Sequence, residues 1–260
     1  MNALRTVGAL TAREMLKFVR DRSRVLGALA QPLALWLLLG LGFQNTFQPP
    51  QGGVGESYVA FLFPGILALV LLFTAIFSTI SIVEERDSGF LQAVLVAPTP
   101  RTALVFGTTL GGTLLATVQA LLFLGALPLV DLAPGLLGVG MVTAICLLTG
   151  LAFTALGFAI AWRMDTTRGF HAIMNLFLLP LWFLSGAMFP VEGAAPVLQV
   201  FVWANPVSYA VSGLRHGLHG FAETPAVWAG PGVCLAVTGG FALLMMGVAV
   251  WQVRRPFFQA

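Results

Sequence analysis

Six long apolar stretches, none of which contains an aspartate, glutamate, lysine or arginine, constrain this chain more than any other feature of its sequence. A helix needs about 20 apolar residues to cross the hydrocarbon core of a bilayer. Within lipid a helix also satisfies its own backbone hydrogen bonds. We therefore predict an all-α polytopic membrane protein with six transmembrane helices, at residues 25–43, 58–83, 102–130, 132–162, 169–189 and 226–252.

The charge content of the whole chain supports this class. Only 9% of the 260 residues are charged and 58% are hydrophobic, whereas soluble domains carry about 25% charged residues. These numbers exclude a disordered chain and a coiled coil, because both need abundant charge. Two cysteines, Cys146 and Cys234, lie inside apolar stretches. We expect them to be buried thiols without a disulfide or a metal.

The basic residues are divided unevenly between the two sides of the predicted bundle. Twelve of the 13 lysines and arginines fall on one side, and only Arg215 falls on the other. Because positive charge in short loops marks the cytoplasmic side, we expect a multi-pass protein of the inner (plasma) membrane with both termini in the cytoplasm. The same placement argues against nucleic acid as the partner of this net charge of +3.

Residues 1–24 are predicted to form an amphipathic helix in the membrane interface before the first span. At 100° per residue, one face of this helix carries Arg13, Lys17, Arg20 and Arg24. Such a helix lies in the interface with its cations towards anionic headgroups and water. We therefore expect membrane lipid as a partner; the alternative is a soluble targeting extension.

Gly107 and Gly111 form the pattern Gly-x-x-x-Gly in the predicted third span. Glycines four residues apart allow a second helix to approach closely. One match is weak evidence in a chain with 29 glycines, so the close contact is a hypothesis.

Residues 84–98 combine charge with apolar side chains on the predicted cytoplasmic side. Four charged residues end the second span, a glycine follows, and two prolines punctuate the apolar helical stretch after it. Apolar residues on a water-side loop need a partner surface; the membrane interface is the alternative. The residues that we single out are Glu84, Glu85, Arg86, Gly89, Phe90, Leu91, Val94 and Leu95.

The external segment at residues 190–221 is too apolar for a free loop, and prolines break it into short helices. Irregular backbone at membrane depth is tolerated only where protein or a water-filled cavity covers it. We predict a re-entrant pair of helices that dips into the outer leaflet; a folded cap on the membrane is the alternative. The residues that we single out in this segment and at the end of the span before it are Gly186, Phe189, Pro190, Asn205, Pro206, Tyr209 and Arg215.

Taken together, the two segments resemble those of the permease subunits of type-2 ABC exporters, the ABC-2-type permeases. The Glu-Arg…Gly…Leu…Pro run is similar to that family's cytoplasmic coupling segment after the second span. The Ser-Gly-x-x-Phe-Pro…Asn-Pro-x-x-Tyr…Leu-Arg run is similar to its re-entrant outer segment. Span count and the N-terminal helix also fit, so the resemblance covers nearly the whole chain. Phe90 departs from the pattern, because a threonine with a capping hydroxyl is common there.

The resemblance implies a permease that exports a drug, a lipid or a lipid-linked glycan. It implies a homodimer, or a heterodimer with a similar permease, docked on two ABC ATPase subunits. The residues singled out in 84–98 would enter a cleft on the ATPase as a coupling helix, and those of the outer segment would form a gate. No cofactor is expected in this chain, since ATP and Mg would be bound by the partner ATPase.

The residues themselves agree with a subunit that takes its energy from elsewhere. The chain has no Gly-x-x-x-x-Gly-Lys-Ser/Thr phosphate loop, and the predicted spans contain no aspartate, glutamate, lysine or arginine, with His171 near one end. The sequence shows no group of residues arranged as a catalytic site, so we expect no enzyme activity of this chain by itself. His216 and His219 are expected to belong to a polar helix face rather than to a metal site. We favour a hydrophobic or amphipathic cargo. A passive channel or scramblase-like protein and a non-transport membrane assembly factor are the alternatives.

Overall fold

The computed structural model describes residues 3–20, 22–43, 57–96, 100–130, 132–191, 195–221 and 227–254. Every regular element in these ranges is helical, which confirms the predicted fold class. The elements are α1 (Ala3–Arg20), α2 (Arg22–Gly42), α3 (Tyr58–Ser78), α4 (Ile80–Asp87), α5 (Phe90–Val96), α6 (Arg101–Phe123), the 3-10 helix η1 (Leu124–Leu129), α7 (Leu136–Ala161), α8 (Thr167–Phe183), α9 (Pro196–Ala204), α10 (Pro206–Leu218) and α11 (Pro231–Arg254). Pro98, which ends the predicted coupling segment, and the side chains of Arg24 and Leu95 lie outside the described part of the chain.

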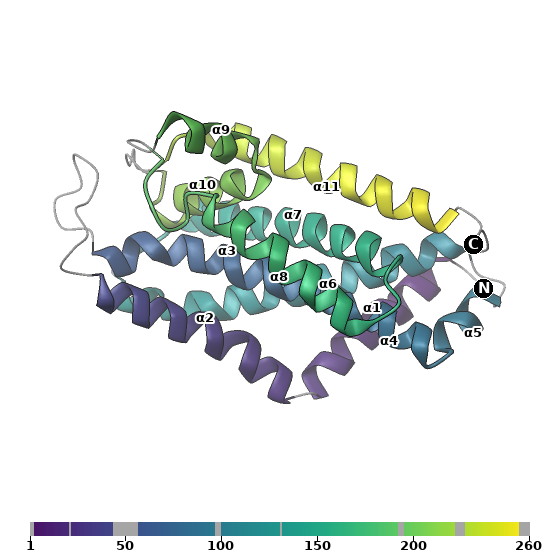
Figure 1. Cartoon of the computed structure of the whole chain (residues 1–260). Coiled ribbons are helices and arrows are strands. Elements are labelled where there is room, and N and C mark those ends of the chain that lie inside the picture. Colours follow the sequence, from purple (N-terminus) through teal and green to yellow (C-terminus); the bar gives the residue numbers. More distant parts are fainter. Residues whose placement is uncertain are drawn as a thin grey trace.

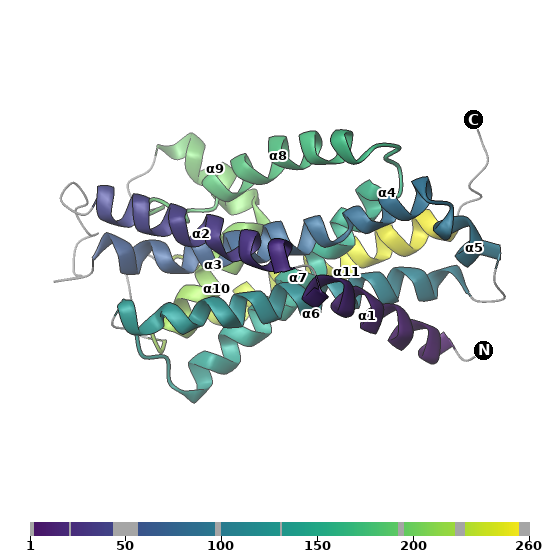
Figure 2. The same cartoon turned by 90° about the horizontal axis from the view of Figure 1, so that it is seen from below.

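Helix α3 forms the centre of the bundle. Its side chains are buried along almost its whole length, and α2, α6, α7, α8 and α10 all contact it. A helix that is apolar on every side is stable only when other elements surround it, and α3 consists mainly of such residues. Helix α2 lies along the lower edge of the bundle in Figure 1, and Figure 2 shows α8 at another edge and α1 beside α6.

Four described helical segments are long and apolar enough to cross a membrane: Tyr58–Asp87, Arg101–Leu129, Leu136–Ala161 and Pro231–Arg254. Counting the bent pair α9–α10 as one span gives five. The first and fifth predicted spans coincide with α2 and α8. Helix α8 has 17 residues and is therefore shorter than these four segments, and α2, with 21 residues, is not among them. The count of six spans therefore remains a prediction.

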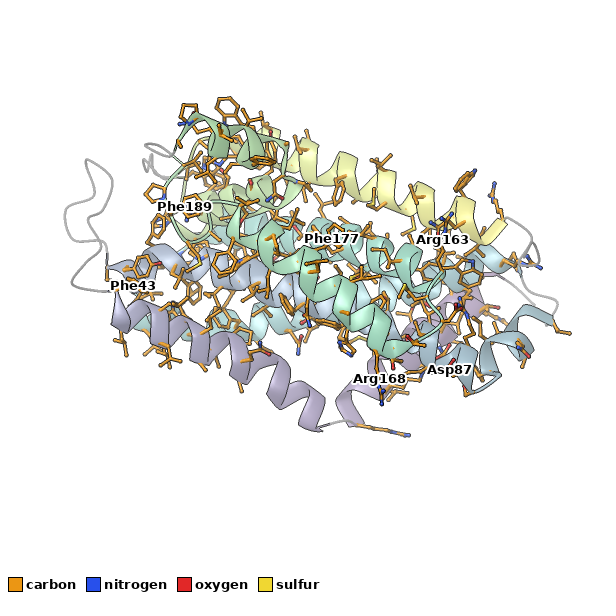
Figure 3. All side chains as sticks on the ribbon, viewed as in Figure 1. Phe43, Asp87, Arg163, Arg168, Phe177 and Phe189 are labelled. Atoms are coloured by element: carbon orange, nitrogen blue, oxygen red, sulfur yellow. The ribbon has the colours of Figure 1, made fainter. Side chains whose placement is uncertain are left out.

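The two segments singled out in the sequence lie at opposite ends of the bundle. Helices α4 and α5 share one end with the C-terminal end of α11, whereas α9 and α10 lie at the other (Figure 1). Figure 3 shows the charged side chains of Asp87, Arg163 and Arg168 towards the first end, and the aromatic rings of Phe43 and Phe189 at the second. We refer to these as the charged end and the aromatic end.

Candidate functional site

Helix α1 packs against the two glycines of the Gly-x-x-x-Gly pattern in α6. A Cβ atom at Gly107 would lie 2.6 Å from Cβ of Leu10, and one at Gly111 would lie 2.9 Å from Cβ of Glu14. The hydroxyl of Thr11 donates a hydrogen bond of 3.2 Å to the carbonyl of Gly107. The hypothesis of a close helix contact is thus confirmed, and the partner helix is α1.

A Gly111→Leu substitution is expected to displace α1, because a side chain at this position would occupy the space of Glu14. Overpacking of this kind typically costs about 1–3 kcal/mol. The measurement is the thermal unfolding temperature of the purified protein, together with the rate at which a protease cleaves α1. Gly140→Leu is the control, because no atom lies within 4 Å of a Cβ at that helical glycine. Equal effects of the two substitutions would contradict the docking of α1 on Gly111.

Four charged side chains of α1 and α4 form one network, which we call the α1–α4 cluster: Arg13, Glu14, Lys17 and Glu85. Oε1 of Glu85 lies 2.6 Å from Nη2 of Arg13 and 2.6 Å from Nζ of Lys17. Oε1 of Glu14 lies 2.7 Å from Nη2 of Arg13 and 3.8 Å from Nζ of Lys17. Glu85 is buried, with 8% of its surface exposed. Burial lowers the pKa of Arg13, but the hydrogen bond to Glu14 and the attraction of Glu85 outweigh it, so the pKa is raised overall.

The α1–α4 cluster changes the interpretation of α1. Its cations were predicted to face lipid headgroups, whereas the structure pairs Arg13 and Lys17 with carboxylates of the same chain. The contact with headgroups remains a prediction: Lys17 is 44% exposed and Arg20 is exposed, and the side chain of Arg24 lies outside the described part of the chain. Helix α1 therefore attaches to α4, at the end of the second predicted span, through these ion pairs.

Arg13 also contacts the start of α5. Its guanidinium carbon lies 4.8 Å from the ring centroid of Phe90, within the range of a cation–π interaction. Gly89, with φ of +76°, provides the turn between α4 and α5 in a conformation that favours glycine. Phe90 departs from the family pattern at this position, and in this chain its ring forms a contact for α1.

Arg86 joins α4 to the turn between α7 and α8. Its guanidinium donates to the carbonyls of Trp162 and Met164, at 2.5 and 2.7 Å, and Nη1 lies 3.5 Å from Asp165. Helix α4 is therefore held through Glu85 on one side and through Arg86 on another.

The residues of the predicted coupling set divide into two groups. Glu85 and Leu91 are buried, Arg86, Gly89 and Val94 are partly buried, and Glu84 and Phe90 are exposed. The inner residues attach α4 and α5 to the bundle. The exposed residues, together with others that the sequence analysis did not single out, form what we call the α4–α5 surface: Glu84, Asp87, Phe90, Gln92, Ala93 and Val96.

The outer segment bends sharply at Asn205. Helices α9 and α10 meet at 85°, and Oδ1 of Asn205 accepts a hydrogen bond of 2.9 Å from the backbone N–H of Val207, which caps α10. Its Nδ2 donates to the carbonyl of Leu181 in α8 at 2.6 Å. Pro206 occupies the first turn of α10, where its missing N–H costs nothing. Asn205 therefore shapes the bend and ties it to α8.

Arg215 is buried at the aromatic end, with 2% of its surface exposed. Its Nη2 donates to the carbonyl of Gly186 at 3.0 Å, and its guanidinium carbon lies 4.3 Å from the centroid of Phe61 in α3. Nearby, the indole of Trp182 donates to the carbonyl of Gly65 at 2.7 Å. These contacts fix the loop after α8 against α3 and α10, and we call them the outer latch.

The other residues predicted for the outer segment lie around this latch. Gly186 has φ of +73°, which favours glycine. Phe189 and Pro190 are partly buried beyond it. Tyr209 donates from its hydroxyl to the carbonyl of Trp203 at 2.9 Å and so bridges α10 and α9.

A cavity of about 480 Å³ lies between α1, α2, α3, α6 and α8. On each of four helices, a polar lining residue lies nearer the charged end and a leucine lies nearer the aromatic end, although Phe77 also lines the cavity beside Ser78. The pairs are Gln31 and Leu35 on α2, Ser78 and Leu69 on α3, Thr108 and Leu115 on α6, and His171 and Leu179 on α8. Glu14 and Lys17 of the α1–α4 cluster complete the polar end. The cavity is thus amphipathic, and its polar end adjoins the contact between α1 and α4.

The match to known proteins covers most of these elements, because residues 5–219 fit the family described as ABC-2 type transporter. The chain belongs to this family. ABC-2 permeases are membrane subunits of ABC transporters and associate with an ABC ATPase, and this ABC-2 permease is accordingly an integral membrane protein.

Individual relatives agree with the family. Nodulation protein J of Sinorhizobium fredii (strain NBRC 101917 / NGR234) is 32% identical over 243 residues, 90% of this chain and 82% of the relative. The Porphyra purpurea protein named as transport permease ycf38 is 28% identical over 82% of this chain and 74% of its own length. The Escherichia coli K12 protein named as multidrug ABC transporter permease YbhR is 25% identical over 59% of this chain and 42% of its own length.

Proposed function

We propose that this ABC-2 permease is the membrane subunit of an ATP-driven exporter that moves a hydrophobic or amphipathic molecule out of the cytoplasm or the inner leaflet. The observation that carries the proposal is the amphipathic cavity between α1, α2, α3, α6 and α8. An amphiphile whose apolar part enters first would meet leucines there, while its polar part would meet the hydrogen-bonding side chains at the charged end. The name of the Escherichia coli relative, which refers to multidrug transport, agrees with such a cargo.

The α4–α5 surface is the part of this chain that we propose for docking on the ATPase. It combines the carboxylates of Glu84 and Asp87 with the exposed side chains of Phe90 and Val96, which are 44% and 86% exposed. Exposed apolar groups beside charge are typical of a protein contact. ATP and Mg would be bound by that partner, and work would reach the bundle through Glu85 and Arg86.

The proposed topology has six spans, with α2 and α8 crossing the membrane beside the four longer segments. Both termini and the charged end would face the cytoplasm across the plasma membrane, as the positive charges favour. Helices α2 and α8 expose apolar side chains, among them Leu38, Leu176 and Phe177. These side chains would face lipid or a second permease, either an identical copy or a similar subunit.

The test is purification of the tagged permease from its host, followed by transport in proteoliposomes with rhodamine 6G as an amphipathic probe. We expect an ABC ATPase to co-purify and uptake into inside-out vesicles to require ATP and Mg. Equilibration of the probe without nucleotide would instead support the channel or scramblase-like alternative. Absence of any ATPase and of any transport would leave an assembly factor as the better interpretation.

Asn175→Trp is expected to weaken transport of the probe, because Asn175 lines the cavity and an indole would occupy part of its volume. We expect the concentration for half-maximal transport to rise by about tenfold, as for the loss of one well-packed contact. Leu176→Trp is the matched control, since Leu176 is 70% exposed on the same helix and does not line the cavity. If both substitutions leave this concentration unchanged, the cargo does not use the cavity.

A further inference from the structure

Lys17 belongs to two structural features at once. It lines the polar end of the cavity, and its Nζ lies 2.6 Å from Oε1 of Glu85 in α4. Its neighbour Glu14 also lines the cavity and lies 3.8 Å from the same Nζ. One side chain therefore forms part of the cavity wall and part of the attachment of α4.

The ion pair between Lys17 and Glu85 is suited to being broken and remade. The side chain of Lys17 is 44% exposed, whereas that of Glu85 is 10% exposed. A lysine ammonium on a flexible stem holds its partner less rigidly than an arginine does, and half-exposed ion pairs are weak. A molecule that fills the polar end of the cavity competes with Glu85 for the ammonium or displaces it.

Loss of the Lys17 contact would loosen α4 and α5 without releasing them. Arg13 keeps Glu85 at 2.6 Å and keeps its guanidinium over the ring of Phe90 at 4.8 Å. The structure shows the tightly held state, with two cations on Glu85, and breaking the Lys17 contact would produce a looser state with one. A ligand shifts such an equilibrium only by its differential affinity for the two states, and the shared side chain provides that difference.

We infer that Lys17 transmits the occupancy of the cavity to α4 and α5, so that a bound cargo loosens the segment that contacts the ATPase. The inference rests on the proposed function for the identity of the cargo and of the partner. Lys17 acts here as a positioning residue through Glu85. Cargo-dependent stimulation of ATP hydrolysis would then depend on the ion pair between α1 and α4.

The test fills the cavity covalently, so it needs no knowledge of the natural cargo. Asn175→Cys places a thiol on the cavity wall, and benzyl methanethiosulfonate then attaches a benzylthio group to it through a disulfide, with release of methanesulfinate. The native Cys146 and Cys234 are buried, which favours reaction at the new position. The readout is hydrogen–deuterium exchange of residues 84–96 in the permease in lipid nanodiscs, with mass spectrometry to verify labelling.

We expect labelling of Asn175→Cys to increase exchange in residues 84–96 by about fivefold, the lower end of typical coupling between two sites. The increase should disappear when Lys17→Met is added, and also when Glu85→Gln is added in its place. Two controls match these changes. Leu176→Cys carries the benzyl group on the exposed face of α8, and Arg5→Met removes an exposed cation from α1.

Three outcomes would overturn the inference. The first is an equal increase with and without Lys17, and the second is unchanged exchange despite complete labelling. The third is a thiol at position 175 that does not react, since the cavity would then be closed to a ligand. The exchange measurement involves no ATPase, so failure of the proposed function appears separately, as a permease that binds no ATPase.

Discussion

A Glu85→Lys substitution is expected to abolish ATP-dependent transport. Glu85 is the buried carboxylate between Arg13 and Lys17, so the substitution would place three cations together with only Glu14 to balance them. Removing one partner of a buried charge network typically costs roughly 3–5 kcal/mol. We expect α4 and α5 to detach from α1 and the permease to lose its ATPase. The measurements are the amount of co-purified ATPase and the ATP-dependent uptake of rhodamine 6G.

The control for this prediction is Glu84→Lys, which makes the same change of charge at the neighbouring exposed position. It is expected to weaken docking only by altering the α4–α5 surface, and to leave the unfolding temperature of the permease unchanged. Glu85→Lys should lower that temperature, because it disrupts contacts within the chain. If Glu84→Lys proves the more damaging to the fold, the position assigned to Glu85 in the α1–α4 cluster is wrong.

Sequence patterns predicted the helical class because the backbone of a membrane span must form its hydrogen bonds within the segment. They also predicted the two informative segments, since charge, glycine and proline mark helix ends in any context. The bounds of the spans were harder to predict from the sequence. Helix α2 runs from Arg22 to Gly42 and α8 from Thr167 to Phe183, whereas the predicted spans were 25–43 and 169–189, because hydropathy does not mark the residues at which a helix begins and ends.

Pairing between distant elements was not predictable from one sequence. The amphipathic pattern of α1 placed Arg13 and Lys17 on one face, but it could not show that the face meets Glu85, 68 residues from Lys17. The Gly-x-x-x-Gly pattern was the available signal, because it marked the groove in α6 that receives α1. It did not identify the partner helix.

The cavity and the partners of Arg215 in the outer latch were missed for a related reason. Leu69, Phe73 and Leu115 appear in the sequence as ordinary apolar residues of a span, and only helix packing shows that they line a cavity. Phe61 likewise carries no signal until the guanidinium of Arg215 lies over its ring. Arg215 itself was conspicuous as the one basic residue on the predicted external side, and the structure shows that it is buried.

The outer latch leads to the second large effect: Arg215→Lys is expected to impair both stability and transport even though it conserves charge. A planar guanidinium lies over the ring of Phe61 while it donates to the carbonyl of Gly186. A lysine ammonium is more strongly hydrated and lacks this planar fork, so it cannot replace both contacts. Loss of a buried hydrogen bond from a charged group costs about 1.5–3 kcal/mol. The unfolding temperature and ATP-dependent uptake of rhodamine 6G should both fall.

A structural effect and a gating effect of the latch can be separated. Phe61→Leu removes only the ring, and a double-mutant cycle with Arg215→Lys measures the coupling between the two side chains. Arg168→Lys is the control, since the same substitution is made there at an exposed arginine at the start of α8, far from the latch.

If the loop after α8 opens during transport, Phe61→Leu should raise nucleotide-independent leakage of the probe, whereas a purely structural contact would change only the unfolding temperature. Additive effects of the two substitutions would show that Phe61 and Arg215 do not act together, and the latch would then consist of the hydrogen bonds of Arg215 to Gly186 and of Trp182 to Gly65.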